Sequence, residues 1–268
     1  MRPPELFDAD LLARRRARAL RQGPADFLQE AAIEEILDRR AGVNRSFRDA
    51  VVITARPDLW AERLGVRALP EAETLALAPG TEDLVVHAMG LHWANDPVGQ
   101  LVQCRRALRP DGLFLGAMFG GRTLQELRAA LTEAEAAETG GLSPRVAPMG
   151  EIRDLGGLLQ RAGFALPVAD AVTLTASYAD GLALMRDLRA MGETNVLRDR
   201  LRRPTARRVI ARAAAILAER FAGADGRVRA TFELVFLAGW APAPSQPQPL
   251  KPGSATHSLA EALKPLGD

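Results

Sequence analysis

The middle of this 268-residue chain alternates short β-rich runs with helical segments, and no other feature constrains its fold as strongly. Residues 84–89 and 113–119 have the apolar, β-rich character of buried strands. Residues 97–108 between them are typical of a helix, and an Arg-Pro-Asp-Gly turn follows. Because a crossover between parallel strands usually holds a helix, this pattern predicts an α/β domain built on a parallel sheet.

The same alternation extends in both directions along the chain. Upstream we expect helices over 8–22, 25–40 and 59–64, with strands over 49–55 and 74–78. Downstream we expect helices over 123–138, 149–162, 180–191 and 205–221, with strands over 168–176 and 227–240. The predicted parts are therefore a helical extension (1–45), an α/β domain (46–240) and a proline-rich linker with a short helix (241–268).

The composition excludes several kinds of site. Cys104 is the only cysteine, which excludes an intramolecular disulfide and a cysteine-cluster metal site. His87, His92 and His257 lack zinc-binding spacing, so we expect no metal. No apolar run approaches the roughly 20 residues that a membrane span needs, so we expect no transmembrane segment. The first residues lack the apolar core of a secretion signal, and we therefore predict a cytoplasmic protein.

Arginine dominates the basic residues, since Lys251 and Lys264 are the only lysines among 35 basic side chains. The formal net charge of +2 is too small to indicate nucleic-acid binding, and no specific nucleic-acid partner is expected. The arginines of the first helix either bind an acidic partner or RNA, or form a solvated helix face; they are Arg14, Arg15, Arg16 and Arg18. We favour the solvated face, because no aromatic residues alternate with these arginines to stack on bases.

Several motifs resemble those of one large enzyme superfamily. The segments LHWANDP and ALRPDGLF resemble the region around the fourth and fifth strands of class I S-adenosylmethionine (SAM)-dependent methyltransferases. The segments GAMFGGRTLQELRAAL, GLSPRVAPMGEIRDLGGLLQRAGF and LMRDLRAMGETN resemble one branch, the methyltransferase-like assembly factor of respiratory complex I, described as a protein arginine hydroxylase. The malonyl-carrier-protein methyltransferases of biotin synthesis are a weaker match. The resemblance covers most of residues 5–240.

The resemblance implies a Rossmann-like methyltransferase fold with added N-terminal helices. It implies SAM as cofactor, lying over the carboxyl ends of the first strands. A glycine-rich turn after the first strand and an acidic residue ending the second strand would hold it. It also implies a protein partner, either a protein substrate or a subunit of complex I.

The cofactor half of this pattern departs from the family. The family-like sequence LDLGCG falls on residues 51–56, so its glycines become Thr54 and Arg56, and Pro57 follows. Residues 56–83 are also too few for the two strands and three crossovers that the fold ordinarily places there, so we expect a truncated sheet edge. The acids available in this stretch, none of which follows a convincing strand, are Glu71, Glu73, Glu82 and Asp83.

The candidate site residues fall into two groups. Cofactor-side candidates are Thr54, Ala55, Arg56, Ala88, Met89, His92 and Trp93. Substrate-side candidates are Met118, Phe119, Gly120, Gly121, Arg122, Glu193 and Asn195. Some have two interpretations: Arg56 binds an acidic group or lies in a purely structural turn, His92 is a general base or a surface turn residue, and Gly120 lets a ligand approach or relieves a tight turn.

Two functions remain open at this point. The first is an assembly factor of the complex I branch with a degenerate SAM site, either non-catalytic or using another ligand. The alternative is an active SAM-dependent methyltransferase with a rebuilt pocket. A hydroxylase would need an oxygen-activating centre, and the sequence has no pattern of two histidines and one carboxylate for a metal.

Overall fold

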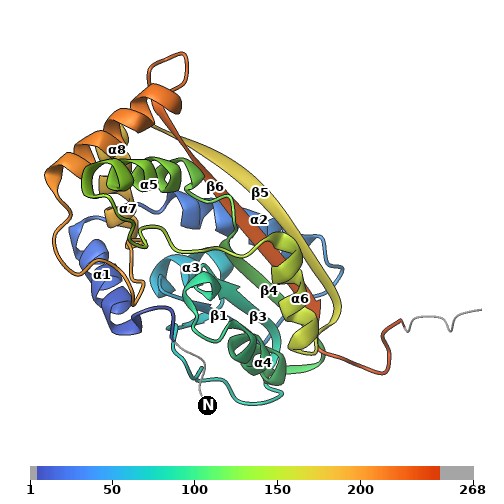
Figure 1. The fold of residues 1–268 in the computed structure, drawn as a ribbon. Coiled ribbons are helices and arrows are strands. Elements are labelled where there is room, and N and C mark those ends of the chain that lie inside the picture. The colour runs from blue at the N-terminus through green and yellow to red at the C-terminus, as the bar shows by residue number, and fades with distance from the viewer. Residues whose placement is uncertain (1–4, 248–268) are drawn as a thin grey trace, which may run out of the picture.

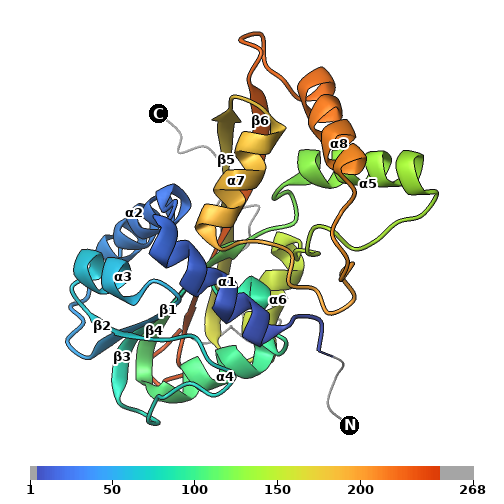
Figure 2. The ribbon, with the colours of Figure 1, turned by 90° about the vertical axis from the view of Figure 1, so that its left-hand side faces the viewer.

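A single six-stranded sheet organises the computed structural model, which describes residues 5–247. Its strands are β1 (Ala50–Thr54), β2 (Arg67–Leu69), β3 (Glu82–Ala88), β4 (Leu108–Phe119), β5 (Ala165–Tyr178) and β6 (Val228–Trp240). They lie in the order β2-β1-β3-β4-β6-β5, with β2 labelled in Figure 2 and the other strands in Figure 1. The first four are parallel, β6 runs antiparallel to β4, and β5 runs antiparallel to β6. The predicted α/β class and Rossmann-like sheet are confirmed.

Helices cover both faces of the sheet. They are α1 (Ala9–Gln22), α2 (Phe27–Ala41), α3 (Pro57–Leu64), α4 (Pro97–Ala107), α5 (Gln125–Thr139), α6 (Ile152–Arg161), α7 (Gly181–Met191) and α8 (Arg207–Arg220), with a short 3₁₀ helix η1 (Leu91–Trp93). One core cluster joins α2, α3, α5, α7 and α8 to the sheet, and the other joins α4 and α6 to its opposite face. Helix α1 instead crosses the edge where the parallel strands end (Figures 1 and 2).

Strand β1 shows why the sequence folds this way. Its side chains alternate between the two cores, with Val52 in one and Val51 and Ile53 in the other. All three are fully buried, as expected for a parallel strand covered by helices on both faces. An uninterrupted β-branched run therefore suits this position, and the expected strand over 49–55 is confirmed at Ala50–Thr54.

The prediction of a strand over 74–78 is wrong. The second strand is β2, which pairs in parallel with β1, and residues 70–79 form an irregular connection. Side chains of α4 satisfy the backbone there: Gln100 Nε2 donates to the carbonyl oxygens of Ala72 and Glu73, and Gln103 Oε1 accepts from the Leu75 amide. These bonds replace a strand ladder. One strand lies between β1 and β3 where the resemblance implied two, so the sheet edge is truncated as predicted.

The end of β6 leads into a short segment that folds back against the sheet. The Gln246 side chain donates to the Ala241 carbonyl oxygen at 2.8 Å and to Asp111 Oδ1 at 2.9 Å. Asp111 itself has a φ of 63°, and strand β4 continues through this region rather than starting after a separate turn as predicted. The predicted C-terminal helix lies outside the described residues. No helix within residues 5–247 is long and apolar enough to cross a membrane.

Trp60 of α3 is a sensitive point of the larger core. It is fully buried, and its Nε1 donates to Gln29 Oε1 of α2 at 2.8 Å. We expect Trp60→Ala to lower the free energy of unfolding by about 3–5 kcal/mol, because it leaves a cavity and an unpaired amide oxygen. Urea unfolding measures this change. Leu142→Ala, at a residue 66% exposed, is the control and should change stability by less than about 0.5 kcal/mol.

Candidate functional site

The carboxyl ends of the parallel strands meet at one edge of the sheet, and α1 lies across that edge (Figure 2). The turn at Thr54 follows β1, Glu71 follows β2, Met89 follows β3 and Gly120 follows β4. In an open α/β sheet, this edge is where ligands bind. The predicted site segments begin at residues 54, 88, 92 and 118. They therefore lie at the edge where ligands are expected.

Arg16 of α1 reaches into this edge and lies between two carboxylates. Its Nη1 is 2.6 Å from Glu71 Oε2, and its Nη2 is 2.9 Å from Glu193 Oε1 and 3.3 Å from the Met89 carbonyl oxygen. The Arg16 side chain is only 11% exposed. Burial works to lower the pKa of Arg16, but Glu71 and Glu193 outweigh burial and raise it above its ordinary value. The prediction of a solvated arginine face is therefore wrong for Arg16.

Glu193 is the centre of a second set of contacts. Its Oε2 accepts from the indole Nε1 of Trp93 and lies 3.4 Å from His92 Nε2. The Phe119 amide donates to His92 Nδ1 at 3.4 Å, which leaves Nε2 as the ring nitrogen that can donate to Glu193. Burial works to raise the pKa of Glu193, but Arg16 and then His92 overcome it and hold the pKa at about 2.

The environment of His92 decides between its two interpretations. Its side chain is 1% exposed, so the interpretation as a surface turn residue is wrong. It packs between the rings of Trp93 and Phe119, with centroid distances of 5.4 Å and 4.7 Å. Trp93 in turn packs edge-on against Phe7, which precedes α1. The rim of β3 thus holds an aromatic cluster whose polar atoms converge on Glu193.

Glu71 is an acidic residue at the carboxyl end of the second strand, where the sequence predicts none. It lies two residues after β2, whose short length hides it from pattern analysis. Gly90 makes room for it, because a Cβ at Gly90 would collide with the Glu71 carboxylate. Glu71 Oε1 is buried and has no hydrogen-bond partner among the residues that the structure describes. The nearby His87 Nδ1, on β3, is in the same situation.

The turn after β1 is closed by its own side chains. The Arg56 amide donates to Thr54 Oγ1 at 3.1 Å, and Arg56 precedes the first residue of α3, Pro57. The Arg56 guanidinium forms an ion pair with Asp26, which precedes α2. Arg56 thus does meet an acidic group, as one interpretation held, but the group belongs to the chain itself.

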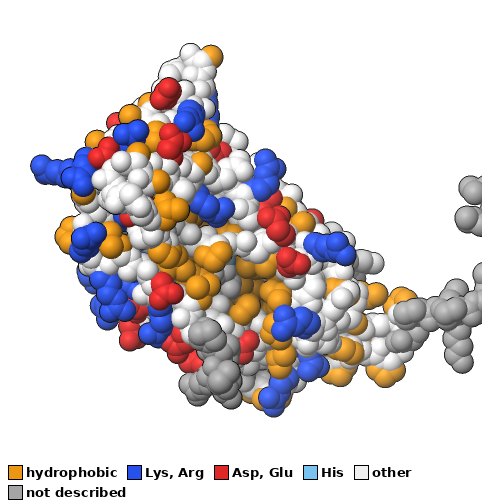
Figure 3. Space-filling view, in the orientation of Figure 1, with side chains coloured by type: hydrophobic (Ala, Val, Ile, Leu, Met, Phe, Trp, Pro, Cys, Tyr) orange, Lys and Arg blue, Asp and Glu red, His pale blue; other side chains and the backbone are white. Residues whose placement is uncertain are grey.

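The substrate-side candidates separate into two environments. Phe119, Glu193 and Asn195 line a cavity of about 230 Å³ together with the cofactor-side candidate Trp93. The remaining walls are mostly apolar side chains of α5, α7 and β6. Gly121 lines a neighbouring cavity of about 450 Å³. Val146 and Met149 line both cavities, and Figure 3 shows hydrophobic side chains gathered in a hollow of this face.

Other predicted site residues lie in the core or contact neighbouring strands. Met118 lies in the core on the α4 side, and Ala88 lies in the larger core. A Cβ at Gly120 would lie 2.6 Å from Val235 Cγ2 of β6, so this glycine serves the close approach of two strands. The Arg122 amide donates to Glu233 Oε2 at 3.2 Å.

The loop over the cavities is anchored by charge. The hydrogen bond from Arg145 lowers the pKa of Glu135 to about 2, with burial opposing it and Ser143 assisting. Arg145 Nη1 also donates to Thr205 Oγ1 at 2.6 Å. The guanidinium of Arg145 therefore donates to α5 and to the segment before α8.

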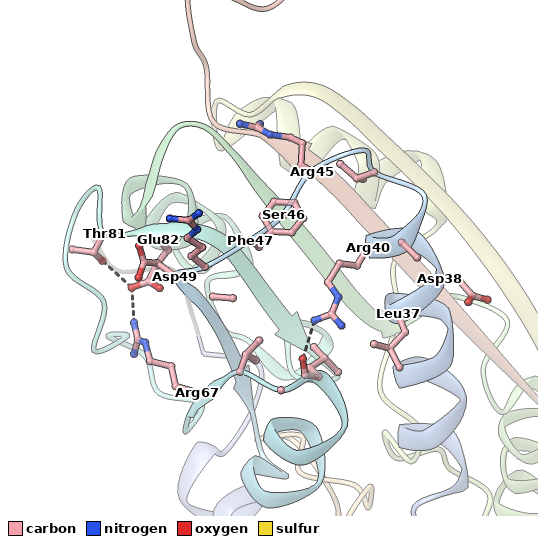
Figure 4. A pocket seen from close by; sticks show the side chains of 17 residues that line it. Leu37, Asp38, Arg40, Arg45, Ser46, Phe47, Asp49, Arg67, Thr81 and Glu82 are labelled. Carbon is pink, nitrogen blue, oxygen red and sulfur yellow. Dashed lines mark hydrogen bonds and ion pairs between the residues drawn. The ribbon is translucent and has the colours of Figure 1, made fainter.

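A larger cavity, of about 1070 Å³, lies at the opposite edge, where β1, β2 and β3 begin (Figure 4). Three of its arginines already have partners: Arg40 donates to the Leu64 carbonyl oxygen, Arg45 to Asp111, and Arg67 to Glu82. It contains none of the predicted site residues, so size alone does not make it the candidate site. Within the described part of the chain, no group of three or more His, Cys, Asp and Glu side chains is placed to hold a metal ion.

Comparison with known proteins identifies the family. Residues 49–116 match the family model described as a methyltransferase domain. The human arginine-hydroxylase NDUFAF5, mitochondrial, is 35% identical over 292 residues, which cover 97% of this chain and 84% of the human protein. This chain belongs to the NDUFAF5 family. The zebrafish (Danio rerio) member is 41% identical over 199 residues, covering 73% of this chain and 61% of that protein.

Weaker matches come from other methyltransferases. The malonyl-[acyl-carrier protein] O-methyltransferase of Xylella fastidiosa (strain M23) is 36% identical over 172 residues, covering 64% of this chain and 56% of that enzyme. A crystal structure of a methyltransferase candidate from Bacillus halodurans C-125 superposes with a TM-score of 0.50 at 13% identity, covering 79% of this chain and 99% of that one. That likeness shows a shared fold. The NDUFAF5-family relatives named above are called mitochondrial, while the cytoplasmic location predicted for this chain stays a prediction.

The depressed pKa of Glu193 predicts a pH-dependent contribution to stability. Its pKa lies at about 2, below the ordinary value of 4.5, so the contribution is full above pH 4.5 and is lost as the pH falls toward 2. We expect Glu193→Gln to lower the free energy of unfolding by about 3 kcal/mol at neutral pH. The difference from wild type should shrink below pH 4.5.

Urea unfolding between neutral pH and pH 3 tests this prediction. Glu62→Gln, at an exposed residue of α3, is the control and should leave the curve unchanged. A difference between wild type and Glu193→Gln that is independent of pH would contradict an ionised, ion-paired Glu193.

Proposed function

We propose that this protein is an assembly factor of respiratory complex I whose SAM site is closed, and that the cavity at the carboxyl edge of its sheet receives a protein partner. The observation that carries the proposal is the position of the Arg16 guanidinium. It lies between Glu71 and Glu193, over the strand ends where the resemblance places SAM. A nucleoside cofactor at this place would have to displace the Arg16 side chain from both carboxylates.

The residues at the edge do not fit SAM in the usual mode. The acid at the end of β2, Glu71, is ion-paired with Arg16. The turn after β1 has Thr54 and Arg56 where the family has glycines, and the Arg56–Asp26 ion pair lies beside it. Thr54, Arg56 and Glu71 line none of the three cavities described above. We therefore assign no reaction step to SAM.

The partner side of the site is better formed. The cavity of about 230 Å³ combines mostly apolar walls with the carboxylate of Glu193, whose pKa is about 2, and Arg145 and Arg189 also line it. Relatives of this chain are named arginine-hydroxylases. The branch that its motifs resemble is an assembly factor of complex I. We infer that this cavity accepts a side chain of a complex I subunit, and we assign the protein an assembly role rather than a group-transfer step.

One observation favours the alternative, an active SAM-dependent methyltransferase with a rebuilt pocket. Glu71 follows β2, as the ribose-binding acid of the family would, and Gly90 leaves space beside it. In that alternative, Arg16 leaves Glu71 and the acid binds the ribose hydroxyls. Glu71 therefore distinguishes the two functions.

Calorimetric titration of the full chain with SAM tests the closed site. We expect no binding at micromolar concentrations, because SAM would have to displace a buried ion pair. Micromolar binding that is lost in Glu71→Gln and kept in Glu73→Gln would instead establish the alternative. Glu73 is the matched control, since it is exposed and lies two residues from Glu71.

Complementation of cells that lack the gene tests the assembly role. We expect Met185→Trp, which fills the cavity from α7, to reduce assembled complex I on native gels, because it excludes the partner side chain. Leu182→Trp, on the exposed side of the same helix, should restore assembly fully. Equal assembly with both variants, when both are present at wild-type levels, would contradict the role of the cavity.

A further inference from the structure

We propose that the outer edge of β5 pairs antiparallel with the same strand of a second copy of this chain, so that two sheets join into one across a two-fold axis. Strand β5 is the last strand of the sheet, and within residues 5–247 it pairs only with β6. Figure 1 shows it along the outer margin of the molecule. This surface is a lateral edge of the sheet, so the pairing does not depend on the proposed function.

The two lateral edges of the sheet differ in their protection against other strands. At one edge, β2 has only 3 residues, and its Arg67 forms an ion pair with Glu82. Short and charged edge strands resist pairing with another chain. At the other edge, β5 has 14 residues, and those from Val168 to Tyr178 pair with β6 without a shift in register. A long regular edge strand directs a row of backbone amide and carbonyl groups away from its one neighbour, which is a template for a further strand.

Strand β5 also lacks the charges by which exposed edges avoid pairing. Asp170 is the only charged residue between Val168 and Tyr178. Its carboxylate forms an ion pair with Arg39 of α2, so a charge from the chain itself compensates it. Val168 is 55% exposed although it is apolar. The edge is therefore long, almost uncharged and partly apolar, which are the properties that favour strand pairing.

The side chains of β5 suit a partner that is itself a strand. Those on one face are half-buried against the larger core; they are Val172, Leu174 and Ala176. Those on the other face are small or β-branched and exposed; they are Ala171, Thr173 and Thr175. Such side chains stabilise a sheet by pairing across neighbouring strands. An added strand would bring partners for both faces as well as for the backbone.

A second copy of β5 satisfies these requirements without placing like charges together. In an antiparallel pair related by a two-fold axis, one residue lies opposite its own copy, and the others pair symmetrically around it. With Thr173 at the centre, Val172 lies opposite Leu174 and Asp170 lies opposite Ala176. A centre at Val172 would instead place Asp170 opposite Leu174. We therefore assign Thr173 to the axis, where two threonines face each other.

The segment that follows β6 in the same chain is a poor alternative occupant of this edge. Pro242, Pro244 and Pro247 lie in it, and proline has no amide hydrogen to donate to a strand ladder. The described part of this segment also folds back toward β4, where Gln246 donates to Asp111. A second copy is therefore the better fit.

The direction of β5 fixes how the two copies would be arranged. Both β4 and β5 run antiparallel to β6, so β5 runs in the same direction as the parallel strands. A two-fold axis at β5 reverses that direction in the second copy. The carboxyl edges of the two protomers therefore lie at opposite ends of the joined sheet, and neither edge takes part in the pairing.

Sedimentation of the full chain and of charge variants at Thr173 tests the pairing. We expect a dimer at micromolar concentrations. Thr173→Lys and Thr173→Glu should each raise the dimer Kd at least about tenfold, because each places two like charges opposite one another. An equimolar mixture of the two variants should dimerise again, because opposite charges then face each other. Thr132→Lys, at an exposed residue of α5, is the control and should dimerise as wild type does.

Crosslinking tests which residue lies on the axis. A short bismaleimide should link two copies of Thr173→Cys, since directly opposite Cβ atoms are about 5 Å apart. Thr175→Cys on the same face is the control and should not be linked, because its two copies would lie about 14 Å apart along the strands. Cys104 is the only native cysteine and is fully buried, so it should not react.

Three results would overturn the pairing. One is a wild-type chain that sediments as a monomer up to its highest soluble concentration. Another is a dimer that both charge variants leave unchanged, or one that their mixture fails to restore. The third is equal crosslinking of Thr173→Cys and Thr175→Cys. Binding of SAM would overturn the proposed function alone, since all these measurements are made without it.

Discussion

The buried ion cluster of Arg16, Glu71 and Glu193 is the interaction on which the working edge of this protein depends. It joins α1, the end of β2 and the end of α7, three elements that are distant in sequence. Removing charges from water costs free energy, so such a cluster stabilises chiefly one arrangement of its partners rather than the fold as a whole. Gly192 supports this arrangement, since a Cβ there would lie 3.1 Å from the Arg16 Cα atom.

The changes in the cofactor half of the fold have one common explanation. The turn after β1 has lost its glycines at Thr54 and Arg56, while an acid at the end of β2 is present as Glu71. We interpret this as a change of ligand at one edge of the sheet. A nucleoside needs close approach to the backbone, which glycine permits. The guanidinium of Arg16 instead binds carboxylates, which Glu71 and Glu193 supply.

Local patterns in the sequence were enough to predict most of the fold, because helices and parallel strands have different periods. Local residues also define helix ends, since the Asp8 side chain caps α1 and Gly192, with a φ of 80°, follows the last residue of α7. Strand β2 escaped prediction because three residues are too few to show a period. The role of Arg16 escaped for another reason: its partners lie 55 and 177 residues away. Only tertiary packing distinguishes it from Arg14 and Arg18, which are exposed.

The short connection between α1 and α2 limits how far Arg16 can move away from its carboxylate partners. Residues 23–26 alone join the two helices, and α2 is fixed in the larger core. Arg16 therefore cannot diffuse away after release, and it returns with an effective concentration in roughly the millimolar range. The tether therefore favours the return of Arg16 to Glu71 and Glu193 whenever α1 is displaced.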